Sequence, residues 1–310
     1  MSACKQVQAP PVNFERVFHH HHRKDKVVVI MGATGSGKSK LAIDLARFFT
    51  PAEIVNSDKM QVYRGLDITT NKVTPEECAG VPHHLLGIAD PDSDFTAADF
   101  IHHASSAVDS IVGRHCVPII AGGSNSYIEA LVGNQNAAFR SRYECCFLWV
   151  DVWLPVLHSF LWNRVDRMVE NGQVEEVREM FDPLADYTRG VRRAIGVPEL
   201  DEFLRREIRE GQGQGQGSNY HNINTKEKEK LQKIHRLHGL WKRNTHRLDA
   251  TEAFVRSGEE AEEAWENHVV KKSRRIVSKF LYDQNHVPAA ATRFDCVFVF
   301  DGNANELTTP

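Results

Sequence analysis

The feature that most constrains the fold is a glycine-rich segment between an apolar run and an amphipathic one. Lys26 to Met31 is a short run of mainly β-branched residues, and apolar residues recur at helical spacing from Leu41 to Ala46. Between them, the residues from Gly32 to Ser39, GATGSGKS, match the pattern G-x-x-x-x-G-K-[ST]. This order of strand, loop and helix is the context in which the pattern binds phosphate, so it predicts a P-loop.

The pattern also predicts how a phosphate is held. Glycines let successive backbone N–H groups close around an anion, and the following helix adds the positive end of its dipole. Lys38 is expected to bridge phosphate oxygens and Ser39 to reach Mg²⁺. The predicted diphosphate-binding set is the whole loop, namely Gly32, Ala33, Thr34, Gly35, Ser36, Gly37, Lys38 and Ser39. This loop indicates a di- or triphosphate ligand but specifies neither the molecule nor the reaction.

Further apolar runs repeat the alternation of strands and helices. Buried strands are expected at Glu53–Asn56, Cys116–Ser124 and Cys145–Trp153. Helices are expected at Thr96–Val112, preceded by capping residues Ser93 and Asp94, and at Tyr127–Val132 and Val156–Phe181. We therefore predict an α/β fold of P-loop NTPase type, with a mainly parallel sheet, helices on both faces and a helical C-terminal region.

The composition along the chain predicts four parts. Residues 1–24, which include four consecutive histidines, are expected to be a disordered or tag-like N-terminus. Residues 25–208 form the predicted P-loop core. A Gly/Gln-rich stretch at 209–225 cannot bury a core and is expected to be a flexible loop. Residues 226–310 are predicted to be a helical part that packs on the core.

Two charged patterns lie in this last part. Lys226, Lys230 and Lys233 share one face of a predicted helix, and this face suits either an anion or plain solvent exposure. A final helix is expected from Glu259 to Leu281, with acidic residues early and basic residues late. This order complements the helix dipole, which favours a structural role for the charges.

Overall composition argues against several classes of protein. Lys and Arg total 38 and Asp and Glu total 41, which gives a net charge of −3 and no broad basic field for nucleic acid. Six cysteines without CxxC spacing favour reduced thiols over disulfides or a zinc site. The sequence has no run of 18 apolar residues, so no membrane-spanning helix is predicted. Neither a signal peptide nor a transit peptide is visible.

Asp58 is the strongest candidate for a reacting group. It follows the second predicted strand in the segment NSDKMQVYRGLDITTNK, Asn56 to Lys72. Ligands of parallel α/β sheets bind beyond the carboxyl ends of strands, so Asp58 is expected in the same crevice as the P-loop. Such a carboxylate can be a Mg²⁺ ligand, a general base or a helix cap, and the pattern alone leaves all three open.

Several segments together resemble the isopentenyltransferase family. The matching segments occur in the family's order: GATGSGKSKLAIDLA, NSDKMQVYRGLDITTNK, GVPHHLLGI, FTAADF, AGGSNSYIEAL and RRAIGVPE. Members transfer a dimethylallyl group to the N6 amine of adenine, on tRNA or on free adenine nucleotides. The resemblance implies that the P-loop holds the diphosphate of dimethylallyl diphosphate, which is the leaving group, with Mg²⁺ as cofactor.

The resemblance also implies roles for individual residues. Asp58 matches the family's base, while Lys38, Thr34 and Arg193 match groups that hold the diphosphate. An exposed surface charge is the alternative for Arg193. The expected acceptor site contains Asp58, Thr69, Thr70 and Asn71, and the acceptor phosphates are assigned to Lys230 and Lys233.

Whether the expected acceptor is tRNA or a free nucleotide is inferred from segments that tRNA-modifying members have and this sequence lacks. Members that modify tRNA carry a long helical insertion after the segment matching AGGSNSYIEAL, whereas Leu131 and Cys145 are only 14 positions apart. The lone Cys296 also does not suit a C-terminal zinc finger. The resemblance is thus to plant adenylate isopentenyltransferases acting on ADP, ATP or AMP, with small molecules as partners and with neither nucleic acid nor a membrane expected.

Three questions stay open. A tRNA isopentenyltransferase without its insertion and a P-loop nucleotide kinase are the alternative functions. The resemblance implies a plastid location, with the cytoplasm as the alternative. The oligomeric state is not predicted.

Overall fold

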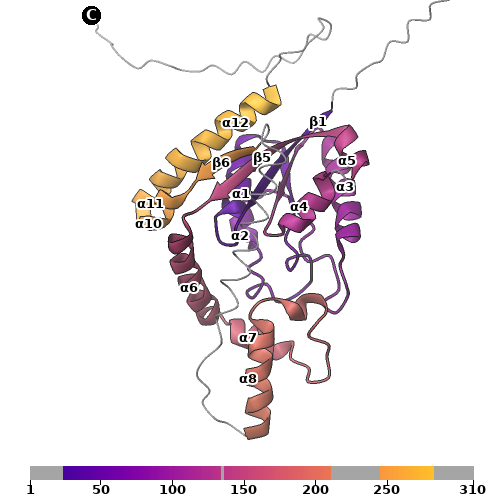
Figure 1. Cartoon of the computed structure of the whole chain (residues 1–310), viewed down its shortest axis with the longest axis vertical. Helices are drawn as coiled ribbons and strands as arrows, with labels where there is room; N and C mark the ends of the chain where they lie inside the picture. Colours follow the sequence, from indigo (N-terminus) through magenta and orange to yellow (C-terminus); the bar gives the residue numbers. More distant parts are fainter. Residues whose placement is uncertain (1–23, 134–135, 211–244, 283–310) are drawn as a thin grey trace, which may run out of the picture.

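The computed structural model describes residues 24–133, 136–210 and 245–282. Its centre is a parallel sheet of six strands in the order β3-β2-β4-β1-β5-β6 (Figure 1). The strands are β1 Asp25–Gly32, β2 Ala52–Asn56, β3 His83–His84, β4 Val117–Ala121, β5 Tyr143–Asp151 and β6 Thr245–Asp249. The carboxyl ends of all six strands therefore meet at one edge of the sheet, which is where ligands of such sheets bind.

Strand β1 lies in the middle of the sheet and is buried on both faces. It pairs in parallel with β4 and β5, so that Val28 lies opposite Ile119 on one side and Cys146 on the other. Alternate residues of β1 enter two separate cores. Val27, Val29 and Met31 belong to one, whereas Val28 and Ile30 belong to the other. Burial on both faces explains why this strand is a continuous apolar run in the sequence.

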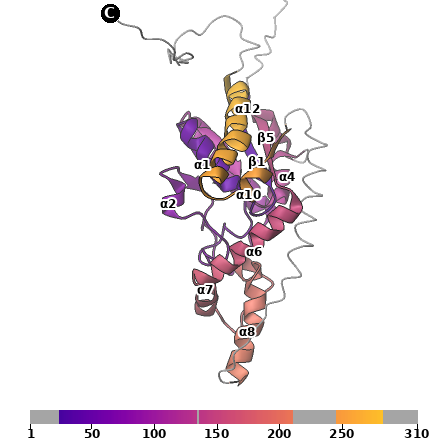
Figure 2. The same cartoon turned by 90° about the vertical axis from the view of Figure 1, so that its left-hand side faces the viewer.

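Helices cover both faces of the sheet. Their bounds are α1 Lys38–Phe48, α2 Pro75–Cys78, α3 Ala97–Gly113, α4 Asn125–Val132, α5 Ala137–Arg142, α6 Leu154–Glu170, α7 Gln173–Glu179, α8 Val197–Glu210, α10 Thr251–Val255, α11 Gly258–Trp265 and α12 Lys271–Tyr282. Residues of α1, α11 and α12 pack on one face, and residues of α3 and α4 pack on the other (Figure 1). Helices α6, α7 and α8 extend beyond the sheet, and α8 lies farthest from it (Figure 2).

The predicted fold class is confirmed, and the differences are local. The predicted helix Val156–Phe181 is two helices, because Gly172 adopts a φ of 96° between α6 and α7. Thr96, rather than Ser93 or Asp94, caps α3 through a capping box with Asp99. The final helix spans the predicted range, with one π turn at Glu266–Val270 between α11 and α12.

Strands β3 and β6 were not predicted. β3 has only two residues, and in β6 only Thr245 and Leu248 are buried, which leaves little apolar pattern to detect. The predictions for the N-terminal tail, the Gly/Gln loop, Lys226, Lys230, Lys233 and Cys296 concern positions outside the described residues. Among the helices that the structure describes, none has the length and apolar character needed to cross a membrane.

Candidate active site

A cleft of about 1280 Å³ lies at the carboxyl ends of the strands. The P-loop after β1, the loop after β2 and the Gly122–Gly123 turn after β4 form its floor. Helix α6 and the segment from α10 to α11 form its walls. The sheet topology thus brings together segments that are far apart in the sequence, as predicted for Asp58 and the P-loop.

The P-loop has the backbone that the glycine pattern predicts. Gly35 and Gly37 have φ values of 78° and 90°, which side-chain-bearing residues rarely adopt. Lys38 is buried, and its Nζ donates a hydrogen bond to the carbonyl oxygen of Ala33 within the same loop. Thr34, Gly35, Gly37, Lys38 and Ser39 line the cleft. The loop therefore presents backbone N–H groups, a hydroxyl and an ammonium group to the same space.

Two apolar side chains from elsewhere hold the P-loop in place. A Cβ atom at Gly37 would lie 2.5 Å from the ring of Trp265 in α11, and one at Gly35 would lie 2.8 Å from Leu161 in α6. The indole Nε1 of Trp265 donates to Asp44 of α1 at 2.9 Å. The C-terminal helices thus pack directly on the phosphate-binding loop.

Asp58 lies next to the P-loop, across the second glycine turn. A Cβ atom at Gly123 would lie 2.5 Å from Oδ2 of Asp58 and 3.9 Å from Oγ1 of Thr34. Gly122 approaches the backbone even more closely, since a Cβ there would lie 2.4 Å from the carbonyl carbon of Ser57. The pair of glycines lets the loops after β1, β2 and β4 close on one another, and it places a carboxylate beside a P-loop hydroxyl.

The helix-cap interpretation of Asp58 is wrong. Its Oδ1 accepts a hydrogen bond from the backbone N–H of Met60 at 2.9 Å, and its own N–H donates to Oδ1 of Asn56 at 3.1 Å. These contacts stabilise a turn, and the residues after Asp58 do not form a helix. One carboxylate oxygen thus orients the turn, and the other, Oδ2, lies on the Gly123 side.

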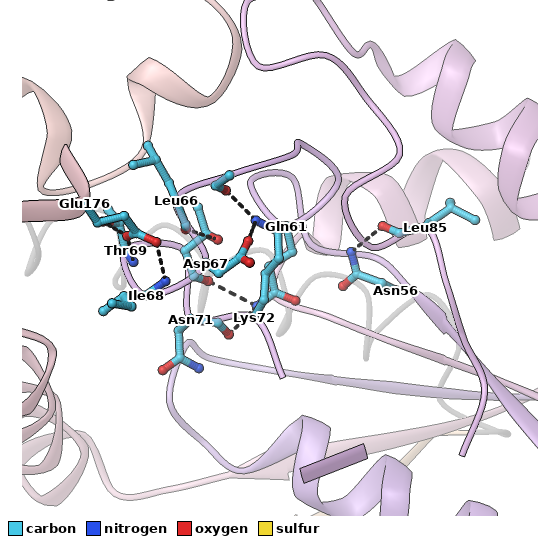
Figure 3. Close-up of polar contacts among 12 residues, drawn as sticks. Asn56, Gln61, Leu66, Asp67, Ile68, Thr69, Asn71, Lys72, Leu85 and Glu176 are labelled. Carbon is cyan, nitrogen blue, oxygen red and sulfur yellow. Dashed lines mark hydrogen bonds and ion pairs between the residues drawn. The ribbon is translucent and has the colours of Figure 1, made fainter. Parts of the chain in front are cut away.

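The three predicted acceptor residues after Asp58 differ in position. Thr70 and Asn71 line the cleft. Thr69 is buried and outside the cleft lining, and its hydroxyl donates to Oε2 of Glu176 at 2.8 Å (Figure 3). Gln61, which the sequence did not single out, lines the cleft and donates through Nε2 to the carbonyl oxygens of Thr70 and Asn71 at 3.2 and 2.8 Å.

Arg193 is held at the margin of the core. Its Nη2 donates to the hydroxyl of Tyr63 at 3.2 Å, and the same hydroxyl accepts the N–H of Phe95 at 3.1 Å. Arg193 is half-buried, so it is not the fully exposed surface charge that was its alternative role. It is absent from the residues that line the described cleft, and its contact with a diphosphate stays a prediction.

Arg193 and Asp58 both influence one buried phenol. Desolvation raises the pKa of Tyr127 far above its usual value, and Tyr63 adds to that rise. The positive charge of Arg193 lowers the pKa of Tyr127, whereas the carboxylate of Asp58 raises it.

Sequence reasoning missed the basic residues in the cleft walls. Arg164 and Arg167 of α6 and Arg256 after α10 line the cleft, and Nη1 of Arg164 is 3.8 Å from the position of a Cβ at Gly35. The spacing of Arg164 and Arg167 in NRVDRM places both on one helix face, which was the available signal. The lysines predicted for the acceptor phosphates, Lys230 and Lys233, lie outside the described residues.

A magnesium ion at this site would depend on its substrate. The part of the chain that the structure describes contains no group of three His, Cys, Asp or Glu side chains able to hold a metal. Ser39 offers a hydroxyl oxygen on the cleft wall, and Asp58 lines the same cleft. These oxygens suit Mg²⁺, which commonly binds through one or two protein ligands, substrate phosphates and water.

Comparison with known proteins identifies the family. The family model described as IPP transferase matches residues 61–141 and 133–233. Adenylate isopentenyltransferase 5, chloroplastic, of Arabidopsis thaliana is 61% identical over 274 residues, covering 85% of this chain and 82% of that protein. Adenylate isopentenyltransferase of Humulus lupulus is 43% identical over 81% of this chain and 89% of its own length.

Solved structures agree with these relatives on the fold. A eukaryotic dimethylallyltransferase acting on tRNA aligns with a TM-score of 0.66 at 22% identity, covering 84% of this chain and 80% of that chain. A tRNA isopentenylpyrophosphate transferase from Bacillus halodurans aligns with a TM-score of 0.61 at 24% identity, covering 84% and 99%. The family model and the sequence relatives show that the chain belongs to the isopentenyltransferase family, in its group of plant adenylate isopentenyltransferases.

Proposed function

We propose that this protein transfers the dimethylallyl group of dimethylallyl diphosphate to N6 of ADP or ATP, or of AMP, and releases diphosphate. This is a step of cytokinin biosynthesis. The observation that carries the proposal is that Asp58 Oδ2 and Thr34 Oγ1 both lie within 4 Å of where a Cβ atom on Gly123 would be, at 2.5 and 3.9 Å. A carboxylate beside a phosphate loop suits a reaction in which a nucleophile loses a proton while a diphosphate leaves.

The chemistry divides between the two sides of the cleft. The lone pair of the adenine N6 amine is delocalised into the ring, so the amine needs a base to become an effective nucleophile. As the N6–C1 bond forms and the C1–O bond breaks, Asp58 accepts the N6 proton and the bonding electrons leave with the diphosphate. Backbone N–H groups of the P-loop and the ammonium of Lys38 stabilise the negative charge that grows on the leaving group.

Mg²⁺ would supply further positive charge to the diphosphate when bound, with Ser39 as the protein ligand. Thr34 is assigned to the diphosphate because its hydroxyl lies on the cleft wall beside Asp58. Arg193 is proposed to contact the diphosphate from the other side, because RRAIG matches the family's segment that carries this arginine. Thr70 and Asn71 are assigned to the adenine nucleotide because they line the cleft next to Gln61.

A free nucleotide is the favoured acceptor over tRNA. The connection from α4 to β5 contains only the short helix α5 among its described residues, in place of a long helical insertion. Relatives with 61% and 43% identity carry the name adenylate isopentenyltransferase. A nucleotide kinase is disfavoured because the family model matches residues 61–141 and 133–233, which lie outside the P-loop that kinases share.

An organellar location is proposed from resemblance. Relatives with 61% and 53% identity are named chloroplastic and mitochondrial, respectively. A fluorescent fusion of the full gene product, imaged with plastid and mitochondrial markers, tests this assignment. Uniform cytoplasmic fluorescence would contradict it.

An acceptor competition assay tests the function. Purified protein is incubated with Mg²⁺, dimethylallyl diphosphate and an equimolar mixture of AMP, ADP, ATP and unmodified tRNA, and products are resolved by mass spectrometry. We expect the added dimethylallyl group on the free nucleotides. Modification of tRNA alone would overturn the adenylate assignment, and formation of a phosphorylated product without an allyl donor would favour a kinase.

A further inference from the structure

The loop from Gly65 to Lys72 is attached to α7 by one carboxylate. Glu176 accepts three hydrogen bonds from this loop: the backbone N–H of Ile68 donates to Oε1 at 2.9 Å, and the N–H and hydroxyl of Thr69 donate to Oε2, each at 2.8 Å (Figure 3). A carboxylate that accepts several N–H and O–H bonds is a strong local anchor. Glu176 thus satisfies polar groups of the loop that would otherwise need water.

The backbone of this loop requires such an anchor. Leu66 and Asn71 have φ values of 50° and 51°, in the left-handed region that residues with side chains rarely occupy. Strained residues of this kind persist where the surrounding structure fixes them, and they concentrate at ligand sites. Inside the loop, the hydroxyl of Thr70 donates to the carbonyl of Leu66 at 2.7 Å, which joins the two ends of the turn.

Side-chain packing reinforces the attachment. A Cβ atom at Gly196 would lie 2.9 Å from Nε2 of Gln173 and 3.9 Å from Cγ2 of Thr69. A Cβ at Gly172 would lie 4.0 Å from Cδ1 of Ile68. The start of α7 and the turn before α8 therefore surround the side of the loop that carries Ile68 and Thr69.

The opposite side of the same loop faces the cleft. Thr70 and Asn71 line it, and their carbonyl oxygens accept the two hydrogen bonds of Gln61. Glu176 and Thr69 are both outside the cleft lining. One residue step along the backbone thus separates the buried Thr69, which Glu176 holds, from the cleft surface at Thr70.

We propose that Glu176 is a positioning residue that sets the acceptor wall of the cleft. It acts through Thr69 to hold Thr70 and Asn71 against the adenine nucleotide, without touching the substrate itself. The P-loop is built on β1 and α1 and is held by Leu161 and Trp265, so Glu176 supports acceptor binding and not donor binding. This inference rests on the proposed function, because it assumes an adenine nucleotide at Thr70 and Asn71.

The test is equilibrium binding of two separate probes, ADP and inorganic diphosphate with Mg²⁺, measured by calorimetry. Both carboxylate oxygens of Glu176 accept hydrogen bonds from the loop. In Glu176→Gln an NH₂ group replaces one of these oxygens and cannot accept a hydrogen bond, so at least one anchoring bond is lost. We expect ADP to bind about tenfold more weakly, with diphosphate affinity unchanged within about twofold. Glu175→Gln is the matched control, since Glu175 is exposed and forms an ion pair with Arg178 of the same helix, and it is expected to change neither affinity.

Thr69 provides a second pair of variants with a smaller change. Thr69→Val removes the hydrogen bond from the Thr69 hydroxyl to Glu176, and we expect it to weaken ADP binding without weakening diphosphate binding. Thr69→Ser keeps the hydroxyl, and we expect it to bind ADP as tightly as the unaltered protein. Equal weakening of ADP and diphosphate, or no weakening of ADP in Glu176→Gln, would overturn the inference. Failure of the unaltered protein to bind ADP would instead overturn the proposed acceptor, so the two failures are distinguishable.

Discussion

Asp58 and Gly123 meet so closely that Oδ2 of the carboxylate lies 2.5 Å from where a Cβ atom on Gly123 would be. The contact joins the loop after β2 to the loop after β4, and Oγ1 of Thr34 in the P-loop is 3.9 Å from the same Cβ position. The position of the proposed base thus depends on the absence of a side chain at residue 123.

Gly123→Ala is expected to displace the Asp58 carboxylate while leaving the P-loop intact. Because a positioned base contributes about 10²–10⁴ in rate, we expect turnover to fall by about tenfold to a hundredfold. Diphosphate affinity should change by less than about twofold. Steady-state rates and calorimetric binding measure the two effects, and unchanged turnover in a folded variant would contradict the placement of Asp58.

The neighbouring glycine predicts a different outcome. A Cβ at Gly122 would meet the backbone of Ser57 and Asp58, which cannot rotate away as a side chain can. Gly122→Ala is expected to lower the free energy of unfolding by about 1–3 kcal/mol, the usual cost of overpacking. Urea titration measures this change. Stability equal to that of the unaltered protein would show that the two loops are less tightly apposed than the structure indicates.

Trp265 is expected to contribute to both stability and phosphate binding. Trp265→Phe keeps ring packing against Gly37 and loses the hydrogen bond to Asp44, which should cost about 1 kcal/mol. Trp265→Ala removes the packing as well and should cost about 3–5 kcal/mol. Thermal and urea unfolding compare the variants, with diphosphate affinity measured at a temperature where each is folded. If Trp265→Phe and Trp265→Ala lowered the free energy of unfolding equally, a role for the Trp265 ring in packing on the P-loop would be contradicted.

The stability of the fold is expected to depend on pH through Glu53 of β2, which lies outside the cleft lining. Burial raises the pKa of Glu53, but hydrogen bonds from Arg114 and His84 outweigh it and hold that pKa below 4.5. A carboxyl with a depressed pKa stabilises the folded state above its unfolded pKa, and this contribution is lost as pH falls through the folded pKa. Stability should therefore decline below about pH 4.5.

Glu53→Gln isolates this contribution. The amide does not titrate, so urea unfolding from pH 7 to pH 3 should show a lower stability at neutral pH and a shallower loss in acid. An unchanged pH slope in Glu53→Gln would mean that other carboxylates cause the acid loss. Asp67→Asn serves as a control, because its ion pair with Lys72 is solvent-exposed on the Asp67 side.

Much of the fold could be predicted from local pattern. β1 is a continuous apolar run because both of its faces are buried, and the glycine positions of the P-loop follow from its positive φ values. By contrast, β6 offers only two buried residues, and its place beside β5 is fixed by the whole sheet. The break between α6 and α7 depends on one glycine that a helical pattern tolerates.

Only part of the site could be predicted, because several of its residues are placed by long-range packing and not by local sequence pattern. Lys38 was found because it belongs to the G-x-x-x-x-G-K-[ST] pattern, and Asp58 because it follows a strand in a parallel sheet, where side chains converge. Thr69 and Thr70 are adjacent and alike in sequence, yet one binds Glu176 and the other lines the cleft. Arg164 and Trp265 reach the P-loop from distant segments, and no local pattern marks such long-range packing.

We propose that Asp58 accepts the N6 proton while the P-loop holds the leaving diphosphate. The sharpest test is single-turnover transfer from dimethylallyl diphosphate to ADP in Asp58→Asn, with the affinity for diphosphate in the presence of Mg²⁺ measured in parallel. We expect the transfer rate to be about 10²–10⁴-fold lower and the diphosphate affinity to be preserved. A rate equal to that of the unaltered protein, or a loss explained entirely by weaker diphosphate binding, would contradict it.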